Sequence, residues 1–248
     1  MFGNITYESD KEKESLKEFT QTFRDCPIPD DEILQNLGLF LSSKVLSRIL
    51  FMDFIYKKII DTEGIVIDFG TRWGQTVSLF SALRGIYEPF NRKRKILAFD
   101  TFKGFLSISS QDGKSVLMKA GIDGVTKDYI DYLNGVLTCQ ENLNPLSHIK
   151  KFEVIAGDAS KELKTYLKKN PETIISLTYF DFDLYEPTNK CLKMIQPYLT
   201  KGSVVAFDEL NDHDSPGETM ALKEVMGLNN VKLERYRYTS RTSYFVMS

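Results

Sequence analysis

The sequence predicts an α/β fold in which a mostly parallel sheet carries helices on both faces and ends in a C-terminal antiparallel hairpin. Runs of β-branched and aromatic residues alternate with segments of helical periodicity, which is typical of successive strand–helix units. The first run, 65–67, leads through a turn with Gly70 and Gly74 into a helical pattern, which is how a ligand-binding corner of such a sheet is built. The last two runs, 231–238 and 242–246, are too close in the chain for a helical crossover and must pair antiparallel.

Length and composition indicate one large soluble domain. The chain has 248 residues, of which 42% are hydrophobic and 27% are charged, as is usual for a globular protein. The net charge of -2 gives no general attraction to nucleic acid or to an anionic membrane. No apolar run approaches the roughly 18 residues that a membrane span needs. The widely spaced cysteines, and an N-terminus without the apolar core of a signal peptide, predict a reduced, cytoplasmic protein.

The chain is expected to divide into an N-terminal helical part, 1–60, and a sheet domain, 61–248. Within the first part, 1–29 is polar and predicts a partly helical arm, whereas 33–60 predicts one or two packing helices. The basic run 92–95 is interpreted as a solvated turn before a strand. Strands are expected at 65–67, 96–99, 152–156, 174–180 and 203–207, and helices at 75–85, 129–136, 160–168, after 185 toward 199, and between 217 and 226.

Acidic residues lie at or just beyond the carboxyl ends of the expected strands. They are Asp68, Asp100, Asp158, Asp181, Asp183, Asp208 and Glu209. Because the carboxyl ends of parallel strands share one edge of a sheet, we expect these side chains to line one crevice and to bind a ligand there. The alternative is that each acid caps the helix or turn that follows it.

The chemistry of these acids suggests a nucleoside and a metal ion as ligands. Asp100, at the end of the second strand, can accept hydrogen bonds from both hydroxyls of a ribose. Asp158 can accept a hydrogen bond from an adenine amino group. The other acids at this edge would repel one another without a hard divalent cation, so Mg²⁺ is predicted beside Asp181, Asp183, Asp208 and Glu209.

Four stretches of the chain resemble the macrocin O-methyltransferase family. They are Asp-Phe-Gly at 68–70, Phe-Asp-Thr-Phe-Lys-Gly-Phe at 99–105, Asp-Phe-Asp-Leu-Tyr-Glu-Pro-Thr at 181–188 and the acid pair at 208–209, and the likeness extends from Asn36 to about Met226. The resemblance implies a class I methyltransferase (Rossmann-like) fold. It also implies S-adenosylmethionine-dependent methylation of a sugar hydroxyl, often with Mg²⁺.

The resemblance assigns roles to individual residues. It implies that Asp68 and Gly70 lie by the methionine part of the cofactor. Asp100 then holds the ribose, and Asp158 faces the adenine. The full set of cofactor-binding residues expected is Asp68, Gly70, Thr71, Arg72, Gly74, Asp100, Thr101, Phe102, Gly157, Asp158, Ala159 and Asp181. The metal ligands expected are Asp181, Asp208 and Glu209, the last standing where the family usually has a second aspartate.

The reaction expected is in-line transfer of a methyl group to a sugar hydroxyl, which must lose its proton. Two residues stay open as the base. Asp183 lies two residues after Asp181, so it can share the rim if the strand has ended there and faces the same side as Asp181 if the strand continues. His213 lies in a polar loop after the acid pair. Asp181 would contribute by holding a metal that activates the hydroxyl. The residues expected to contact the acceptor are Trp73, Tyr87, Tyr185 and His213.

Two other functions stay open on the sequence alone. One is a catechol-type O-methyltransferase for small molecules, and the other is a non-catalytic module that binds a nucleotide. The expected partner is a sugar or sugar-nucleotide substrate, such as a nucleotide-activated deoxysugar or heptose, or a glycoside. No nucleic acid or membrane partner is expected, and a homodimer is left open.

Overall fold

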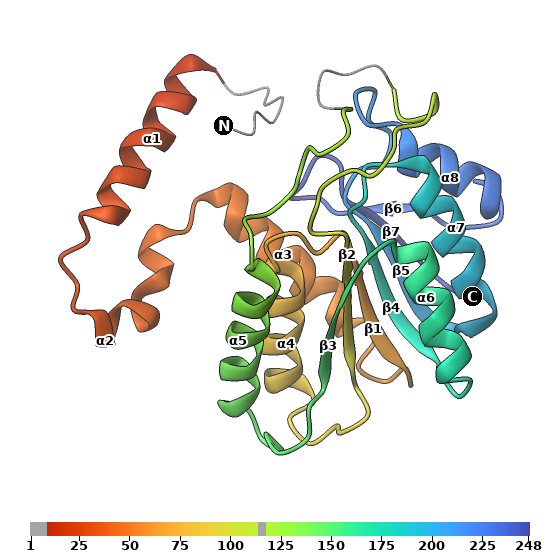
Figure 1. The fold of residues 1–248 in the computed structure, drawn as a ribbon, viewed down its shortest axis with the longest axis horizontal. Coiled ribbons are helices and arrows are strands. Elements are labelled where there is room, and N and C mark those ends of the chain that lie inside the picture. The colour runs from red at the N-terminus through yellow and green to blue at the C-terminus, as the bar shows by residue number, and fades with distance from the viewer. Residues whose placement is uncertain (1–8, 114–117) are drawn as a thin grey trace.

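The computed structural model describes residues 9–113 and 118–248, and its centre is a seven-stranded sheet with helices on both sides (Figure 1). The strand order is β3-β2-β1-β4-β5-β7-β6. β1 to β5 run parallel, whereas β7 is antiparallel to both β5 and β6, so the predicted sheet with its C-terminal hairpin is confirmed. The strands are β1 (Ile65–Phe69), β2 (Ile96–Asp100), β3 (Phe152–Ala156), β4 (Ile175–Phe180), β5 (Leu199–Phe207), β6 (Glu234–Arg235) and β7 (Ser243–Val246).

The helices precede the sheet or connect its strands. They are α1 (Asp10–Arg24), α2 (Asp30–Ile33), the 3₁₀ helix η1 (Leu34–Phe40), α3 (Ser43–Lys57), α4 (Gln75–Tyr87), α5 (Tyr129–Asn142), α6 (Ala159–Lys169), α7 (Tyr185–Ile195), the 3₁₀ helix η2 (Gln196–Tyr198) and α8 (Gly217–Val225). In the part of the chain that the structure describes, none of these helices is long and apolar enough to cross a bilayer.

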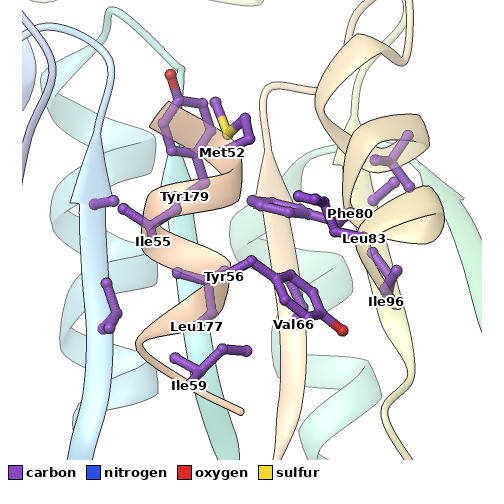
Figure 2. Close-up of a cluster of buried hydrophobic side chains, with 14 of the residues drawn as sticks. Met52, Ile55, Tyr56, Ile59, Val66, Phe80, Leu83, Ile96, Leu177 and Tyr179 are labelled. Carbon is purple, nitrogen blue, oxygen red and sulfur yellow. The ribbon is translucent and has the colours of Figure 1, made fainter. Parts of the chain in front are cut away.

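A hydrophobic core lies on each face of the sheet. Neighbouring residues of a strand point to opposite faces, so Val66 of β1 joins the core beneath α3, α4 and α5, whereas Ile67 joins the core beneath α6, α7 and α8. Figure 2 shows the first of these cores, in which Ile55 and Tyr56 of α3 and Phe80 of α4 pack against the strands. The strands are therefore fixed from both sides, and their carboxyl ends meet at one edge.

The N-terminal part of the chain consists of two structurally different pieces. α1, α2 and η1 bury no residue, and Figure 1 shows them standing away from the sheet. α3 is instead anchored in the core by Phe51, Met52, Ile55 and Tyr56. The division of the chain at residue 60 stays a prediction, but the last helix before it is packed as part of the sheet's core.

The turn after β1 passes unusually close to the end of β4. Gly70 follows β1 with a φ of 85°, which is a left-handed conformation. A Cβ atom at this position would overlap the backbone carbonyl of Asp181, so a glycine is required here. The N–H of Asp181 donates to the carbonyl of Phe69 at 2.9 Å and fixes the same approach. The ends of β1 and β4 therefore form a continuous rim.

The prediction of a solvated basic turn at 92–95 is wrong for one of its residues. Arg94 is buried, with only 2% of its surface exposed. Its guanidinium donates to both carboxylate oxygens of Glu88, at 2.8 and 2.9 Å, and to the carbonyls of Ile59 and Thr62. Tyr56 donates to the same carboxylate at 2.8 Å. Arg94 therefore ties the end of α3 to the loop before β2.

Replacing Arg94 with methionine should lower the free energy of unfolding by about 3–5 kcal/mol, because the buried Glu88 carboxylate would lose its countercharge. Urea denaturation monitored by circular dichroism measures the change. Arg92→Met is the matched control, since Arg92 is exposed in the same turn, and it should shift stability by no more than about 0.5 kcal/mol. Equal effects of the two substitutions would contradict the structural role of Arg94.

Candidate active site

A large pocket opens at the carboxyl ends of β1 to β5, with a volume of about 1060 Å³. The structure brings most of the predicted site residues together in its walls. They are Gly70, Thr71, Arg72, Trp73, Asp100, Thr101, Gly157, Asp158, Ala159, Asp181, Asp183, Asp208 and Glu209. The shared edge of parallel strands, on which the sequence argument rested, therefore does assemble these residues.

Asp100 joins the end of β2 to the turn after β1. One of its carboxylate oxygens accepts the backbone N–H of Arg72 at 2.8 Å, and the other accepts the N–H of Phe102 at 2.5 Å. Burial raises the pKa of this carboxyl above its ordinary value, although the two N–H donors oppose the shift. The carboxylate is held rigidly at the wall of the pocket, and its remaining lone pairs can accept hydrogen bonds from a ligand.

Asp158 both lines the pocket and caps a helix. Its side chain accepts the backbone N–H of Ser160 at 3.0 Å, at the start of α6. The capping role that the sequence left open for each acid is therefore real at this position. It leaves the second carboxylate oxygen, 3.5 Å from the Lys161 ammonium, at the edge of the pocket.

Three predicted cofactor residues lie beneath the pocket surface instead of in its wall. Asp68 is fully buried and accepts a hydrogen bond from the Thr71 hydroxyl at 3.0 Å, and burial raises the pKa of its carboxyl to about 7. Gly74 starts α4 with a φ of 78°, where a Cβ would strike the side chain of Leu133. Phe102 belongs to the core under α5. These residues shape the turns that line the pocket and do not border the pocket themselves.

Three residues predicted to contact the acceptor also lie outside the pocket. The prediction for Tyr87 is wrong, because it ends α4 at the far edge of the sheet and its hydroxyl donates to Asp53 at 2.6 Å. Tyr185 begins α7 but turns its hydroxyl to Glu224. His213 is exposed on its loop, and only its neighbours Asp212 and Asp214 reach the pocket. Of the predicted acceptor contacts, Trp73 alone lines the pocket.

We call the acids at the ends of β4 and β5 the acid cluster; they are Asp181, Asp183, Asp208 and Glu209. Two arginines lie among these acids. Arg48 of α3 contacts Asp181 at 2.8 Å and Asp208 at 2.7 Å through its two terminal nitrogens. Arg241 contacts Glu209 from the loop before β7. The sequence argument missed both arginines. A signal for Arg48 was present, since Lys44 and Arg48 are one turn apart in a helix that is otherwise mostly apolar at its inner face.

These contacts decide whether a divalent ion fits the acid cluster. Three carboxylates are a chemically suitable donor set for Mg²⁺, but the Arg48 guanidinium takes the position between two of them. Asp208 also accepts a hydrogen bond from the Tyr179 hydroxyl. Among the residues that the structure describes, no group of three or more His, Cys, Asp or Glu side chains is arranged to hold a metal. The predicted Mg²⁺ site does not fit this arrangement as it stands.

Asp183 and Glu209 are neighbouring carboxyls of the acid cluster, of which Glu209 is buried and Asp183 half-buried. Burial, together with the charges of Glu209 and Asp181, raises the pKa of Asp183 well above its ordinary value. Burial also raises the pKa of Glu209, although Arg241 opposes that shift. Two adjacent carboxyls away from solvent cannot both ionise readily, and the charge of the neighbouring Glu209 is one cause of the raised pKa of Asp183.

One buried carboxylate on α8 holds the two acid-bearing segments in place. Glu218 is completely buried and accepts the backbone N–H of Phe182 at 2.9 Å, that of Asp183 at 3.3 Å and that of Glu209 at 3.3 Å. Sequence reasoning missed this residue because its partners are backbone groups. Glu218 therefore sets the spacing between the loops that follow β4 and β5.

The chain is similar along almost its whole length to the methyltransferase CalS11. A structure described as the calicheamicin methyltransferase CalS11 is 38% identical, with a TM-score of 0.95 over 97% of this chain and 94% of that chain. A second, apo structure, described as CalS11, a TDP-rhamnose 3'-O-methyltransferase of calicheamicin biosynthesis, is 36% identical, with a TM-score of 0.86 over 97% and 96% of the two chains.

More distant structures share the fold alone. The O-methyltransferase NovP is 16% identical, with a TM-score of 0.59 over 82% of this chain and 80% of that chain. No protein-family model matches the sequence, and no curated protein sequence matches it either. At the identity and coverage found for CalS11, shared ancestry extends over both the arm and the sheet. The chain therefore belongs to the macrocin O-methyltransferase-like family, whose members are S-adenosylmethionine-dependent O-methyltransferases.

Proposed function

We propose that this enzyme methylates a hydroxyl of a nucleotide-activated sugar. The observation that carries the proposal is the pocket, in which a polar cradle after β1 and β2 adjoins the acid cluster after β4 and β5. Its volume of about 1060 Å³ lies just above the usual range for small-molecule sites, which runs from about 300 to 1,000 Å³. There is room for a cofactor and an acceptor side by side. CalS11, described as acting on TDP-rhamnose, supports the choice of acceptor class.

The polar cradle after β1 and β2 is suited to binding S-adenosylmethionine. When bound, this cofactor supplies an electrophilic methyl group on a sulfonium sulfur. The turn after Gly70 lets the backbone approach the ligand closely. Asp100, fixed by two N–H donors, offers lone pairs to a ribose, and Asp158 offers its second carboxylate oxygen, 3.5 Å from the Lys161 ammonium, at the neighbouring strand end. These residues would hold and orient the cofactor in the pocket that the acid cluster also lines.

The acid cluster suits removal of the acceptor proton. Asp183 lines the pocket, and the neighbouring Glu209 charge contributes to its raised pKa, so in its ionised form Asp183 can accept the proton of the sugar hydroxyl. The oxygen then forms a bond to the methyl carbon as the carbon–sulfur bond breaks, and sulfur keeps that electron pair as a neutral thioether. His213 is exposed and outside the pocket, so of the two bases left open by the sequence we assign the role to Asp183.

Mg²⁺ has no assigned step in this proposal, because Arg48 stands where the ion was expected. A planar phenol as acceptor, as in catechol-type enzymes, has no specific observation in its favour. The cytoplasmic location and the homodimer stay predictions.

Incubation with S-adenosylmethionine and a panel of acceptors should give a singly methylated product from a deoxysugar nucleotide such as TDP-rhamnose. The panel includes TDP-glucose, free rhamnose and catechol, and mass spectrometry identifies the product. The expected order of turnover is sugar nucleotide above free sugar, because the nucleotide supplies binding energy that positions the hydroxyl. Methylation of catechol alone would contradict the proposed acceptor.

Asp100→Asn should weaken S-adenosylmethionine binding by about 1–3 kcal/mol, the usual contribution of hydrogen bonds to a charged acceptor. Isothermal titration calorimetry measures the affinity. Asp128→Asn is the control, since Asp128 is exposed, does not line the pocket and has a φ of 62° that asparagine tolerates. An unchanged affinity in a folded Asp100→Asn protein would remove Asp100 from the cofactor site.

The turnover number should fall as pH decreases through the raised pKa of Asp183, because protonated Asp183 cannot accept the proton of the hydroxyl. Asp183→Asn should lower kcat by about 100-fold or more at saturating cofactor, a typical contribution of a positioned base. Steady-state kinetics over a range of pH measures both effects.

His213→Ala is the control for this assignment, and it should keep both kcat and the acid limb of the pH profile. A nearly inactive His213→Ala enzyme beside an active Asp183→Asn enzyme would transfer the role of base to His213.

A further inference from the structure

The acids that follow β4 and β5 are already paired with a cation from the protein itself. The two terminal nitrogens of Arg48 lie 2.8 Å from Asp181 and 2.7 Å from Asp208, each carboxylate taking one nitrogen. The three side chains are only 13 to 26% exposed. The guanidinium therefore bridges two largely buried carboxylates. Its electrostatic interaction with them is stronger than that of an ion pair exposed to solvent.

Arg48 reaches this position because α3 is fixed in the core. Met52 lies one turn further along the helix and is fully buried, as are Ile55 and Tyr56 (Figure 2). The guanidinium also lies over the ring of Tyr179, 5.5 Å from its centroid, and Tyr179 donates its hydroxyl to Asp208. The packing of α3 in the core therefore positions the Arg48 guanidinium at the acid cluster.

Arg48 nevertheless does not pair with every polar atom of the acid cluster. The Nε of Arg48 is buried and has no hydrogen-bond partner. Glu209 is 7% exposed, and its second carboxylate oxygen is also buried without a partner. The ion pairs of Arg48 are with Asp181 and Asp208, so this oxygen of Glu209 is an acceptor that the guanidinium leaves unsatisfied. A divalent ion can take oxygen ligands from several carboxylates at once.

We propose that Arg48 is a built-in cation that competes with divalent metal ions for Asp181 and Asp208. A hard ion binds these two carboxylates only when the guanidinium leaves the position between them. The wild-type protein then has a weaker metal site than its acids alone would make, and Arg48 sets that affinity. This inference concerns the binding of a cation and does not depend on the proposed sugar acceptor.

The test is the binding of Mn²⁺ to the full-length protein, measured by electron paramagnetic resonance of the free ion. Arg48→Gln empties the position between the carboxylates, and it should bind Mn²⁺ about 10-fold or more tightly than the wild type, because one positive charge next to the ion is removed. Equal or weaker binding by a folded Arg48→Gln protein would overturn the proposal.

Two further variants separate displacement from a general change of charge. Arg241→Gln removes a positive charge from the same acid cluster without opening the Asp181–Asp208 position, and it should tighten Mn²⁺ binding much less. Equal tightening in Arg241→Gln would overturn the proposal in favour of net charge alone. The double variant Arg48→Gln/Asp208→Asn should lose the gained affinity, and its retention would place the ion elsewhere and overturn the proposal.

Circular dichroism verifies that each variant is folded. Should Arg48→Gln fail to fold, Arg48→Lys takes its place, since an ammonium lacks the planar fork that reaches both carboxylates together. Mn²⁺ affinity in Arg48→Lys should lie above that of the wild type, and an unchanged affinity would overturn the proposal.

Discussion

The accumulation of negative charge at the ends of β4 and β5 is the constraint on which the site depends. The parallel strands end side by side, so the acids after them are brought together by the sheet itself. Carboxylates placed so close in a partly dry pocket repel one another unless cations or protons intervene. The protein places Arg48 between Asp181 and Asp208, and the charges around Asp183 raise its pKa and so favour its protonated form.

Backbone groups give this charged rim its rigidity. Asp100 accepts two N–H groups across the β1–β2 side of the pocket, and Glu218 accepts three across the β4–β5 side. Gly70 lets the two sides meet, since any side chain there would overlap the carbonyl of Asp181. Methyl transfer demands in-line placement of two ligands, and a rim held by backbone hydrogen bonds resists the small displacements that would spoil it.

Local sequence patterns predicted the sheet and most of the pocket because both follow from where strands end. Periodicity located β3 at 152–156 with its observed bounds, and the acids after the strands did converge on one edge. Side-chain pairing could not be predicted in this way. Arg48 is 133 residues from Asp181 and 160 residues from Asp208. Local sequence patterns do not indicate which distant cation pairs with which acid. Asp68 was misplaced for a related reason, since strand position alone does not distinguish an acid at the pocket wall from one beneath it.

Because it carries Arg48, α3 contributes to the active site as well as to the core. α3 precedes the first strand, and its apolar residues suggest only a packing helix. Yet the same helix that buries Ile55 against the sheet places Arg48 at the acid cluster two turns earlier, and Lys44 at the pocket one turn before that. The packing of α3 and the charge balance of the site are therefore coupled. A change that shifts α3 on the sheet would move the guanidinium relative to both carboxylates, even though it lay far from either acid in the sequence.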